Sequence, residues 1–296
     1  MEACLFDIQR RSVRHGPGMR TVVRVKGCPL HCIWCKEPDI QRFRPQLIFD
    51  AARCVGCKEC VRVCRNRVHT VSDDGHGMDL LRCKACGRCV DVCQNGALEL
   101  CGQAATIDEV FASVYKERDS YLPSGGVTVA GGEPLSQADF TAQLLERCRR
   151  HRIHTCVETS GYGSPQALRT VMPVTDLFLF HWKISDRNAA MRHLGVSLSP
   201  ILRSFNTLMK AGCKLILRCQ IVAGINDTDA HFQSMMSLMD QYPALEGVEL
   251  VPRWGTGQHV DLSGRSPVLR RPSEGLLEVW QAYFHDRGYS KVKMVL

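Results

Sequence analysis

The sequence has no unbroken apolar run near the roughly 18 residues that a membrane-spanning helix needs, although apolar residues make up 45% of its 296 positions. The first ten residues also lack the apolar core of a secretory signal peptide. We therefore expect a cytoplasmic protein without a membrane partner. A chain of this length suits one large domain, or one domain that carries an insertion.

Long runs of like charge are missing as well. The 38 basic residues exceed the 30 acidic ones and give a formal charge of +8, but they are scattered along the chain. The densest basic run, Arg147, Arg149 and Arg150, falls in a predicted helix, where such a run usually marks a solvated face. We therefore expect no nucleic-acid partner.

Cysteine, by contrast, is abundant. The chain has 17 cysteines, and in a protein that is not secreted metal ligation accounts for such a number better than a disulfide framework does. Eleven of them fall into three closely spaced groups. The other six are isolated and are expected to be small core residues: Cys4, Cys101, Cys148, Cys156, Cys213 and Cys219.

Two of the three groups lie in one segment, residues 51–101. Apolar periodicity is weak there, so the segment is expected to be an inserted domain that metal holds together. The spacing within each group is typical of bacterial two-cluster ferredoxins, in which the fourth cysteine of each run binds the other cluster. The groups are Cys54, Cys57, Cys60 and Cys64, followed by Cys83, Cys86, Cys89 and Cys93.

This rule predicts the ligands of two [4Fe–4S] clusters. One cluster takes Cys54, Cys57, Cys60 and Cys93, and the other takes Cys83, Cys86, Cys89 and Cys64. A proline usually follows the fourth cysteine of such a run, but Arg65 and Gln94 stand there, so the loop geometry can differ. Structural zinc is the alternative occupant of these sites.

The third group, Cys28, Cys32 and Cys35, directly follows a predicted strand at residues 21–26, and no fourth cysteine is nearby. A cluster bound by three thiolates leaves one iron open, and a metal centre needs such an open position to bind and activate a substrate. This group therefore predicts chemistry and not only electron storage. The alternative is a structural metal loop that recruits a distant cysteine.

From Thr106 onward, short β-rich runs alternate with amphipathic helical patterns, which is typical of βα units around a parallel sheet. A capping box of Thr106 and Glu109 predicts the first helix. Ser199 as N-cap and Gly212 as stop predict a helix at residues 200–211. Further strands are predicted at residues 127–130, 153–158, 176–180, 214–222 and 247–251, with a last one at 291–295, and helices at 138–150 and 229–240.

With the early strand at residues 21–26, six βα units result. The predicted fold class is thus α/β, a partial (β/α)6 TIM-like barrel with an inserted two-cluster ferredoxin-like domain, and its active site would lie at the carboxyl ends of the strands. Residues 1–50 would hold the start of the barrel with the cluster loop, residues 51–101 the insert, and residues 102–296 the remainder of the barrel.

The second barrel strand runs into Gly131, Gly132, Glu133 and Pro134. A double glycine at this place lets the backbone approach a ligand closely, because the Cβ atoms are missing. A plain turn is the alternative meaning of such a pair.

The cysteine loop, with Trp34 directly before its last cysteine, resembles the radical S-adenosylmethionine superfamily. Together with the motifs at residues 6–10, 15–21 and 158–161, nearly the whole chain resembles its glycyl radical enzyme activating enzymes, of the pyruvate formate-lyase-activating type with a two-cluster insert. The resemblance implies S-adenosylmethionine and three [4Fe–4S] clusters as cofactors. It also implies two partners, a glycyl radical enzyme that loses a hydrogen atom from a backbone glycine and a one-electron donor such as flavodoxin or ferredoxin.

In this family the cofactor carries the radical, so no side chain has to act as acid, base or nucleophile. His181 and Trp182 stand where Asp-Ile usually precedes the lysine, Trp254 stands where a histidine is usual, and His15 and Ala190 also depart from the pattern. The cofactor contacts that the resemblance implies are Trp34, Cys35, Gly131, Gly132, Glu133, His181, Trp182, Lys183 and Trp254.

Two other functions stay open at this point. One is a radical S-adenosylmethionine enzyme that acts on another substrate. The other is a multi-cluster electron carrier, which would need neither an open iron nor a cofactor pocket.

Overall fold

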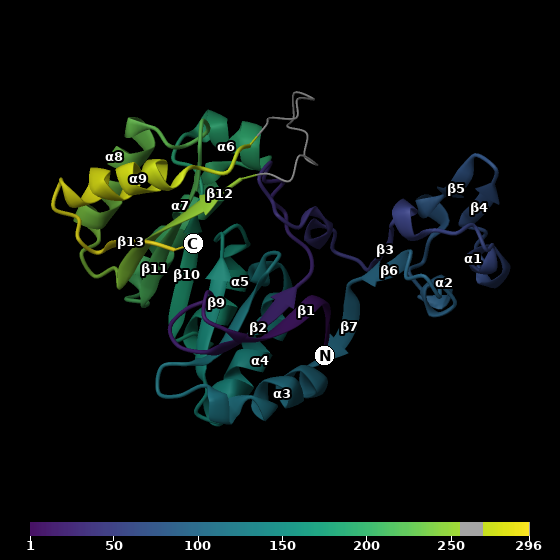
Figure 1. The fold of residues 1–296 in the computed structure, drawn as a ribbon. Helices are drawn as coiled ribbons and strands as arrows, with labels where there is room; N and C mark the ends of the chain where they lie inside the picture. Colours follow the sequence, from purple (N-terminus) through teal and green to yellow (C-terminus); the bar gives the residue numbers. More distant parts are fainter. Residues whose placement is uncertain (255–268, 296) are drawn as a thin grey trace.

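The structure, a computed structural model, describes residues 1–254 and 269–295. Within these residues, one sheet of nine strands in the order β13-β12-β11-β10-β9-β8-β2-β1-β7 forms the body of the molecule (Figure 1). Strand β1 (Glu2–Ser12) pairs antiparallel with both β2 and β7 (Gln103–Thr106). The neighbouring strands are parallel: β2 (Arg20–Val25), β8 (Gly126–Gly131), β9 (His154–Thr159), β10 (Leu177–Trp182), β11 (Leu215–Val222), β12 (Gly247–Arg253) and β13 (Val292–Met294).

The mostly parallel α/β sheet confirms the predicted strands. All six of the expected barrel strands are present, and the candidate at residues 291–295 is β13, which lies parallel beside β12. Every residue of β2 and of β10 is buried, as expected of parallel strands that are covered on both faces. The sequence analysis missed β1 and β7, which extend the sheet beyond β2.

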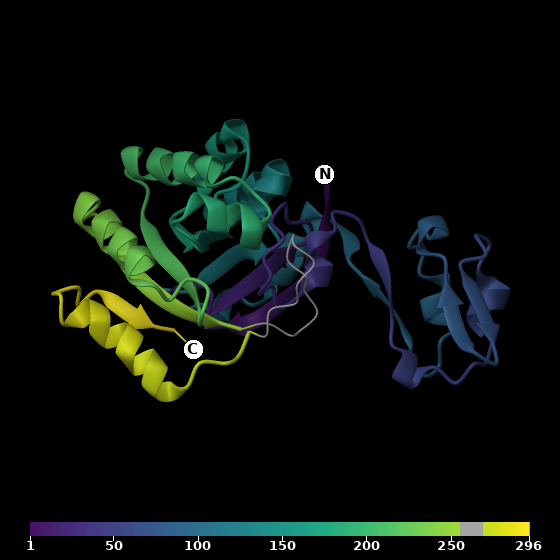
Figure 2. The same ribbon diagram turned by 90° about the horizontal axis from the view of Figure 1, so that it is seen from above.

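Helices follow the parallel strands and cover the sheet (Figures 1 and 2). The capping box is confirmed, because Oγ1 of Thr106 accepts from the backbone N–H of Glu109 and the Glu109 carboxylate accepts from that of Thr106. The helices are α3 (Ile107–Lys116), α4 (Ala138–Arg150), α5 (Pro165–Val171), α6 (Arg187–Leu194), α7 (Leu198–Lys210), α8 (Asp229–Gln241) and α9 (Glu274–His285). Short 3₁₀ helices lie at Pro38–Gln41, Ala51–Arg53, Leu80–Arg82, Arg118–Ser120, Pro134–Gln137 and Met172–Val174.

The predicted start of one helix was wrong. Ser197, and not Ser199, caps α7, because its hydroxyl accepts from the backbone N–H of Ser199. Pro200 then lies in the first turn, where its missing N–H leaves no hydrogen bond unmade. Gly212 follows the helix at φ +69°, in the left-handed conformation of a helix stop, as predicted.

The segment between β3 (Gln46–Phe49) and β6 (Leu98–Cys101) lies apart from the large sheet (Figures 1 and 2). These two strands pair with each other, and between them lie α1 (Glu59–Val63), the hairpin of β4 (His69–Ser72) and β5 (Gly75–Met78), and α2 (Arg88–Asp91). One buried cluster of the segment consists of Leu47, Leu98, Cys60 and Cys89. Half of this cluster is cysteine, so apolar packing alone gives the segment little stability.

Among the described residues, no helix combines the length and the apolar character that crossing a membrane requires.

Candidate active site at the ends of the parallel strands

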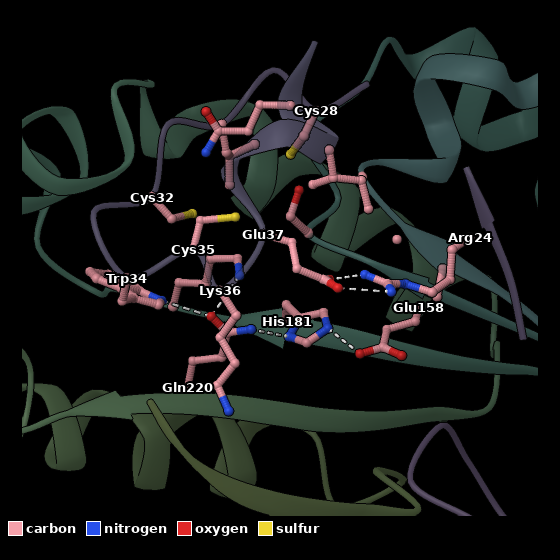
Figure 3. A pocket seen from close by; sticks show the side chains of 18 of the residues that line it. Arg24, Cys28, Cys32, Trp34, Cys35, Lys36, Glu37, Glu158, His181 and Gln220 are labelled. Atoms are coloured by element: carbon pink, nitrogen blue, oxygen red, sulfur yellow. Dashed lines mark hydrogen bonds and ion pairs between the residues drawn. The ribbon is translucent and has the colours of Figure 1, made fainter. Parts of the chain in front are cut away.

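A cavity of about 380 Å³ opens beside the carboxyl ends of β2, β8, β9, β10 and β11. Cys28, Cys32 and Cys35 line it from the loop that follows β2, and Figure 3 shows their sulfur atoms facing the same space. Of the other predicted cofactor contacts, Trp34, Gly131, Gly132, His181 and Lys183 line the cavity too. The structure therefore brings the cysteine loop, the end of β8 and the end of β10 together around the three thiols.

Backbone hydrogen bonds fix the cysteine loop on both sides. Cys28 N–H donates to the carbonyl oxygen of Gln41 at 3.0 Å, and His31 N–H donates to that of Leu194 at 2.8 Å. The Trp34 side chain is 1% exposed and packs in the main core. These hydrogen bonds anchor the loop to the end of α6 and to the residues that follow the loop. They thereby position its three thiols.

The double glycine serves the packing of this loop. Gly132 N–H donates to the carbonyl oxygen of Val25, and Glu133 N–H to that of Gly27, both at 2.8 Å. A Cβ on Gly132 would lie 2.1 Å from the carbonyl oxygen of Gly27. Because Gly132 has no side chain, residues 25–27, which connect β2 to Cys28, can pack closely against it. The missing Cβ also leaves the cavity open.

A chain of buried polar side chains crosses the floor of the cavity (Figure 3). Oε1 of Gln220 accepts from the Trp34 indole at 2.8 Å and from the Lys183 ammonium at 2.7 Å. Nε2 of Gln220 lies 3.0 Å from Nδ1 of His181, and Nε2 of His181 lies 2.6 Å from Oε1 of Glu158. Because the Gln220 amide donates to Nδ1, Nε2 of His181 carries the proton and donates to Glu158.

A buried arginine pairs with Glu158 at the far end of this chain. Arg218 lies 3.2 Å from Glu158 and 2.7 Å from Glu249. Burial raises the pKa of Glu158, but the Arg218 charge and the hydrogen bonds from His15 and His181 outweigh it and hold that pKa well below its usual range. Burial lowers the pKa of His181 to about 4. At neutral pH, Glu158 is thus ionised and His181 is neutral.

The three thiols lie in a setting that disfavours the free thiolate. Burial raises the pKa of Cys28, Cys32 and Cys35, and the positive charge of Lys183 opposes this for all three. A metal that binds them therefore has to displace their protons, and Lys183 is placed to stabilise the negative charge that results.

Three predicted contacts do not line this cavity. Glu133 is buried behind it and accepts hydrogen bonds from Leu135, Thr159 and Ser160, so it ties the turn after β8 to the end of β9. Trp182 packs against Phe205 in the core and donates its indole N–H to Ser185. Trp254 lines a neighbouring cavity of about 720 Å³, where the Lys36 ammonium lies 4.3 Å from its ring centre.

The sequence analysis did not select several residues that do line the cavity. Arg24 on β2 lies 3.2 Å from Asp7 and also pairs with Glu37 in the loop (Figure 3). Glu158, Gln220 and Arg253 reach the cavity from β9, β11 and β12. In the sequence, these residues share one feature, a polar side chain within or at the end of an apolar strand. Burial of such a side chain costs free energy unless it is paired.

The cysteines between β3 and β6 form two further groups. Cys54, Cys57, Cys60 and Cys93 line one cavity of about 230 Å³, together with His76. Cys89 is close enough to Cys64, Cys83 and Cys86 for their charges to act on its thiol. Each set contains the fourth cysteine of the other run, which is the exchange that the ferredoxin spacing predicts.

Comparison with known proteins identifies the family of this chain. The sequence matches the family described as 4Fe-4S single cluster domain over residues 14–179, more than half of the chain. It is 31% identical to the trans-4-hydroxy-L-proline dehydratase activating enzyme of Clostridioides difficile, over 98% of each chain. The chain belongs to the glycyl radical enzyme activating enzymes.

Other members of this activating enzyme family are similar over most of their length. The choline trimethylamine-lyase activating enzyme of Oleidesulfovibrio alaskensis is 34% identical, over 92% of this chain and 91% of that one. The benzylsuccinate synthase activating enzyme of Thauera aromatica is also 34% identical, over 94% and 88%. A solved radical SAM methyltransferase from Sphaerobacter thermophilus shares the fold, with a TM-score of 0.54 and 14% identity over 93% of this chain and 66% of that one.

Proposed function

We infer that this protein activates a partner glycyl radical enzyme by removing a hydrogen atom from a backbone glycine of that partner. The family membership over nearly the whole chain carries this conclusion, because the similar proteins are named as activating enzymes of a dehydratase, a lyase and a synthase. When bound together, S-adenosylmethionine and a reduced [4Fe–4S] cluster supply the 5′-deoxyadenosyl radical that such a reaction needs. The chain's own task is to bind and orient these cofactors and to enclose the reaction.

The donor set of the cavity fits a cluster with an open iron. Cys28, Cys32 and Cys35 line it, and among the described residues no fourth cysteine does. Thiolate sulfur is the usual ligand of iron–sulfur clusters, and a cuboidal cluster held by three thiolates keeps one iron free for another ligand. The cavity therefore supports cofactor binding and not only electron storage.

Lys183 is the residue we assign to the carboxylate of S-adenosylmethionine. Its ammonium lies at the cavity, and Gln220 fixes its position through a hydrogen bond of 2.7 Å. An ammonium near a carboxylate forms a charge-assisted hydrogen bond. The neutral ring of His181 lies between Gln220 and Glu158 and keeps the Glu158 carboxylate oriented without adding a second cation.

For the remainder of the chain, we assign a partial (β/α)6 barrel to residues 1–50 and 102–296 and a ferredoxin-like insert to residues 51–101. The insert would hold two more [4Fe–4S] clusters, on Cys54, Cys57, Cys60 and Cys93 and on Cys83, Cys86, Cys89 and Cys64. The cavity lined by the first four and the proximity within the second four support this assignment. A cytoplasmic one-electron donor such as flavodoxin or ferredoxin would reduce the protein.

The test is anaerobic cleavage of S-adenosylmethionine by the reconstituted, reduced protein, with 5′-deoxyadenosine measured by chromatography. We expect product from the unchanged chain and from Cys213→Ala, a matched control outside the cysteine groups. Cys35→Ala should form none. Equal product from Cys35→Ala and the unchanged chain would show that the cluster is held elsewhere.

A further inference from the structure

The β4–β5 hairpin places a pair of histidines beside one cysteine set of the insert. Nδ1 of His69 lies 3.0 Å from Nε2 of His76. Phe49 on β3 packs edge-on against the His76 ring, with ring centres 4.5 Å apart. His69 and Phe49 thus hold the imidazole of His76 in one orientation.

In this orientation the His76 ring faces two thiols. Nδ1 of His76 lies 3.5 Å from Sγ of Cys54, and Nε2 lies 3.9 Å from Sγ of Cys60. His76 also lines the cavity of about 230 Å³ that Cys54, Cys57, Cys60 and Cys93 share. A ring nitrogen is therefore within hydrogen-bond reach of a predicted cluster ligand.

The chemistry of the ligand fixes the direction of the hydrogen bond. A cysteine that binds iron is a thiolate and can only accept, so Nδ1 of His76 has to donate to Cys54. The second ring nitrogen of His76, Nε2, then accepts a hydrogen bond from Nδ1 of His69. The Nε2 atom of His69 is buried and has no hydrogen-bond partner among the residues that the structure describes. No competing contact there draws the His69 ring away from His76.

The other cysteine set receives hydrogen bonds of a different kind. Val68 N–H donates to Sγ of Cys64 and Ala85 N–H to Sγ of Cys83, both at 3.4 Å. Every residue except proline offers a backbone donor, whereas the imidazole donor depends on the side chain at position 76. The His76 contact therefore depends on its side chain and can be removed by substitution.

We propose that His76, positioned by His69, raises the reduction potential of the [4Fe–4S] cluster held by Cys54, Cys57, Cys60 and Cys93. Hydrogen bonds to the sulfur atoms stabilise the extra negative charge of the reduced cluster, so they favour uptake of an electron. The inference rests on the proposed function, because it requires that these four cysteines bind a cluster. His76 would thereby set the reduction potential at which the insert accepts an electron from the donor.

The experiment uses the full chain with Cys28→Ala, Cys32→Ala and Cys35→Ala, so that only the insert clusters are titrated. Iron and zinc contents are measured first, and an anaerobic redox titration is then followed by electron paramagnetic resonance. His76→Leu should lower one of the two midpoint potentials and leave the other unchanged. His76→Gln keeps an N–H donor and should restore part of the lost potential, while His69→Leu should shift the same potential by less.

The possible results separate the two proposals. If His76→Leu binds the same iron and both potentials stay unchanged, the role of His76 is wrong and the cluster assignment stands. If the parent protein holds zinc or no metal in the insert, the cluster assignment itself fails. If His76→Leu loses iron, His69→Leu decides the matter, because a lowered potential at full iron content supports the inference and an unchanged one overturns it.

Discussion

Trp34 and Lys183 donate hydrogen bonds to the same atom, Oε1 of Gln220, at 2.8 and 2.7 Å. Trp34 belongs to the cysteine loop, whereas Lys183 directly follows β10. One amide on β11 thus connects the predicted cluster loop to the cation assigned to the cofactor. Since Gln220 also donates to His181, a change at position 220 affects both ends of the polar chain.

Gln220→Leu should weaken binding of S-adenosylmethionine, because Lys183 loses the acceptor that positions it. The buried Trp34 indole N–H would also be left unpaired, which should lower the free energy of unfolding by about 1–3 kcal/mol. Calorimetric titration of the reconstituted protein and chemical denaturation measure the two effects. Gln233→Leu, on the exposed side of α8, is the control and should change neither. An unaltered affinity in Gln220→Leu would contradict the role given to Lys183.

Gly132→Ala should damage the cysteine loop. The new Cβ would lie 2.1 Å from the carbonyl oxygen of Gly27, so the backbone before Cys28 has to move, at a cost of about 3 kcal/mol or more. Thermal unfolding and iron content are the measurements, and we expect a lower melting temperature and loss of one cluster. Gly247→Ala is the matched control, because its Cβ would meet no atom within 4 Å. Equal iron and stability in both variants would refute this account of the double glycine.

Two buried histidines should make the protein less stable as the pH falls. Burial lowers the pKa of His181 and of His231 from 6.5 to about 4. The unfolded chain therefore takes up protons near pH 6.5, while the folded chain does so only near pH 4, so unfolding becomes easier as the pH falls through this window. Between about pH 7.5 and pH 5.5, each histidine should cost about 1 kcal/mol of stability.

The variant His231→Gln tests this pH dependence away from the cavity. His231 lies on α8 and contacts Ser185 at 2.8 Å, so its replacement leaves the cysteine loop untouched. Denaturation curves at several pH values should show that this variant loses clearly less stability on acidification than the unchanged chain. An identical slope in the two proteins would mean that His231 already carries a proton in the folded state.

The sequence predicted the parallel part of the fold well, because β8 to β11 are almost wholly buried and their central residues read as short apolar runs. It missed β1, where half-buried polar residues such as Asp7 and Gln9 interrupt the pattern. It also missed β7, which has the sequence Gln-Ala-Ala-Thr and owes its place to pairing with the distant β1. Non-local pairing of this kind leaves little trace in a local pattern.

For the site, cysteine spacing predicted which thiols come together, since the ligand geometry of a cluster constrains the sequence directly. The polar chain from Trp34 to Glu158 was not predictable in the same way. It depends on the register of three strands, in which Glu158 lies beside Leu179 and His181 beside Arg218. The resemblance implied Trp182 as a contact because residues 181–183 stand where the family has Asp-Ile-Lys, but alternation along β10 turns its side chain into the core.

Iron content tests the number of clusters. Anaerobically reconstituted protein should hold about twelve iron atoms, four in each of three clusters. The combined change of Cys28, Cys32 and Cys35 to alanine should leave about eight, whereas changing the isolated Cys148 and Cys213 should leave all twelve. A triple variant that retains the full iron content would show that these cysteines do not hold a cluster.

The most direct test of the activating function mixes three components without oxygen: the reduced, reconstituted protein, S-adenosylmethionine, and a candidate partner glycyl radical enzyme from the same organism. Electron paramagnetic resonance then records the partner. We predict a stable doublet from a glycyl radical, present with the unchanged protein and absent with Cys35→Ala. Cleavage of S-adenosylmethionine without any radical on the partner would contradict the account and favour another substrate for this enzyme.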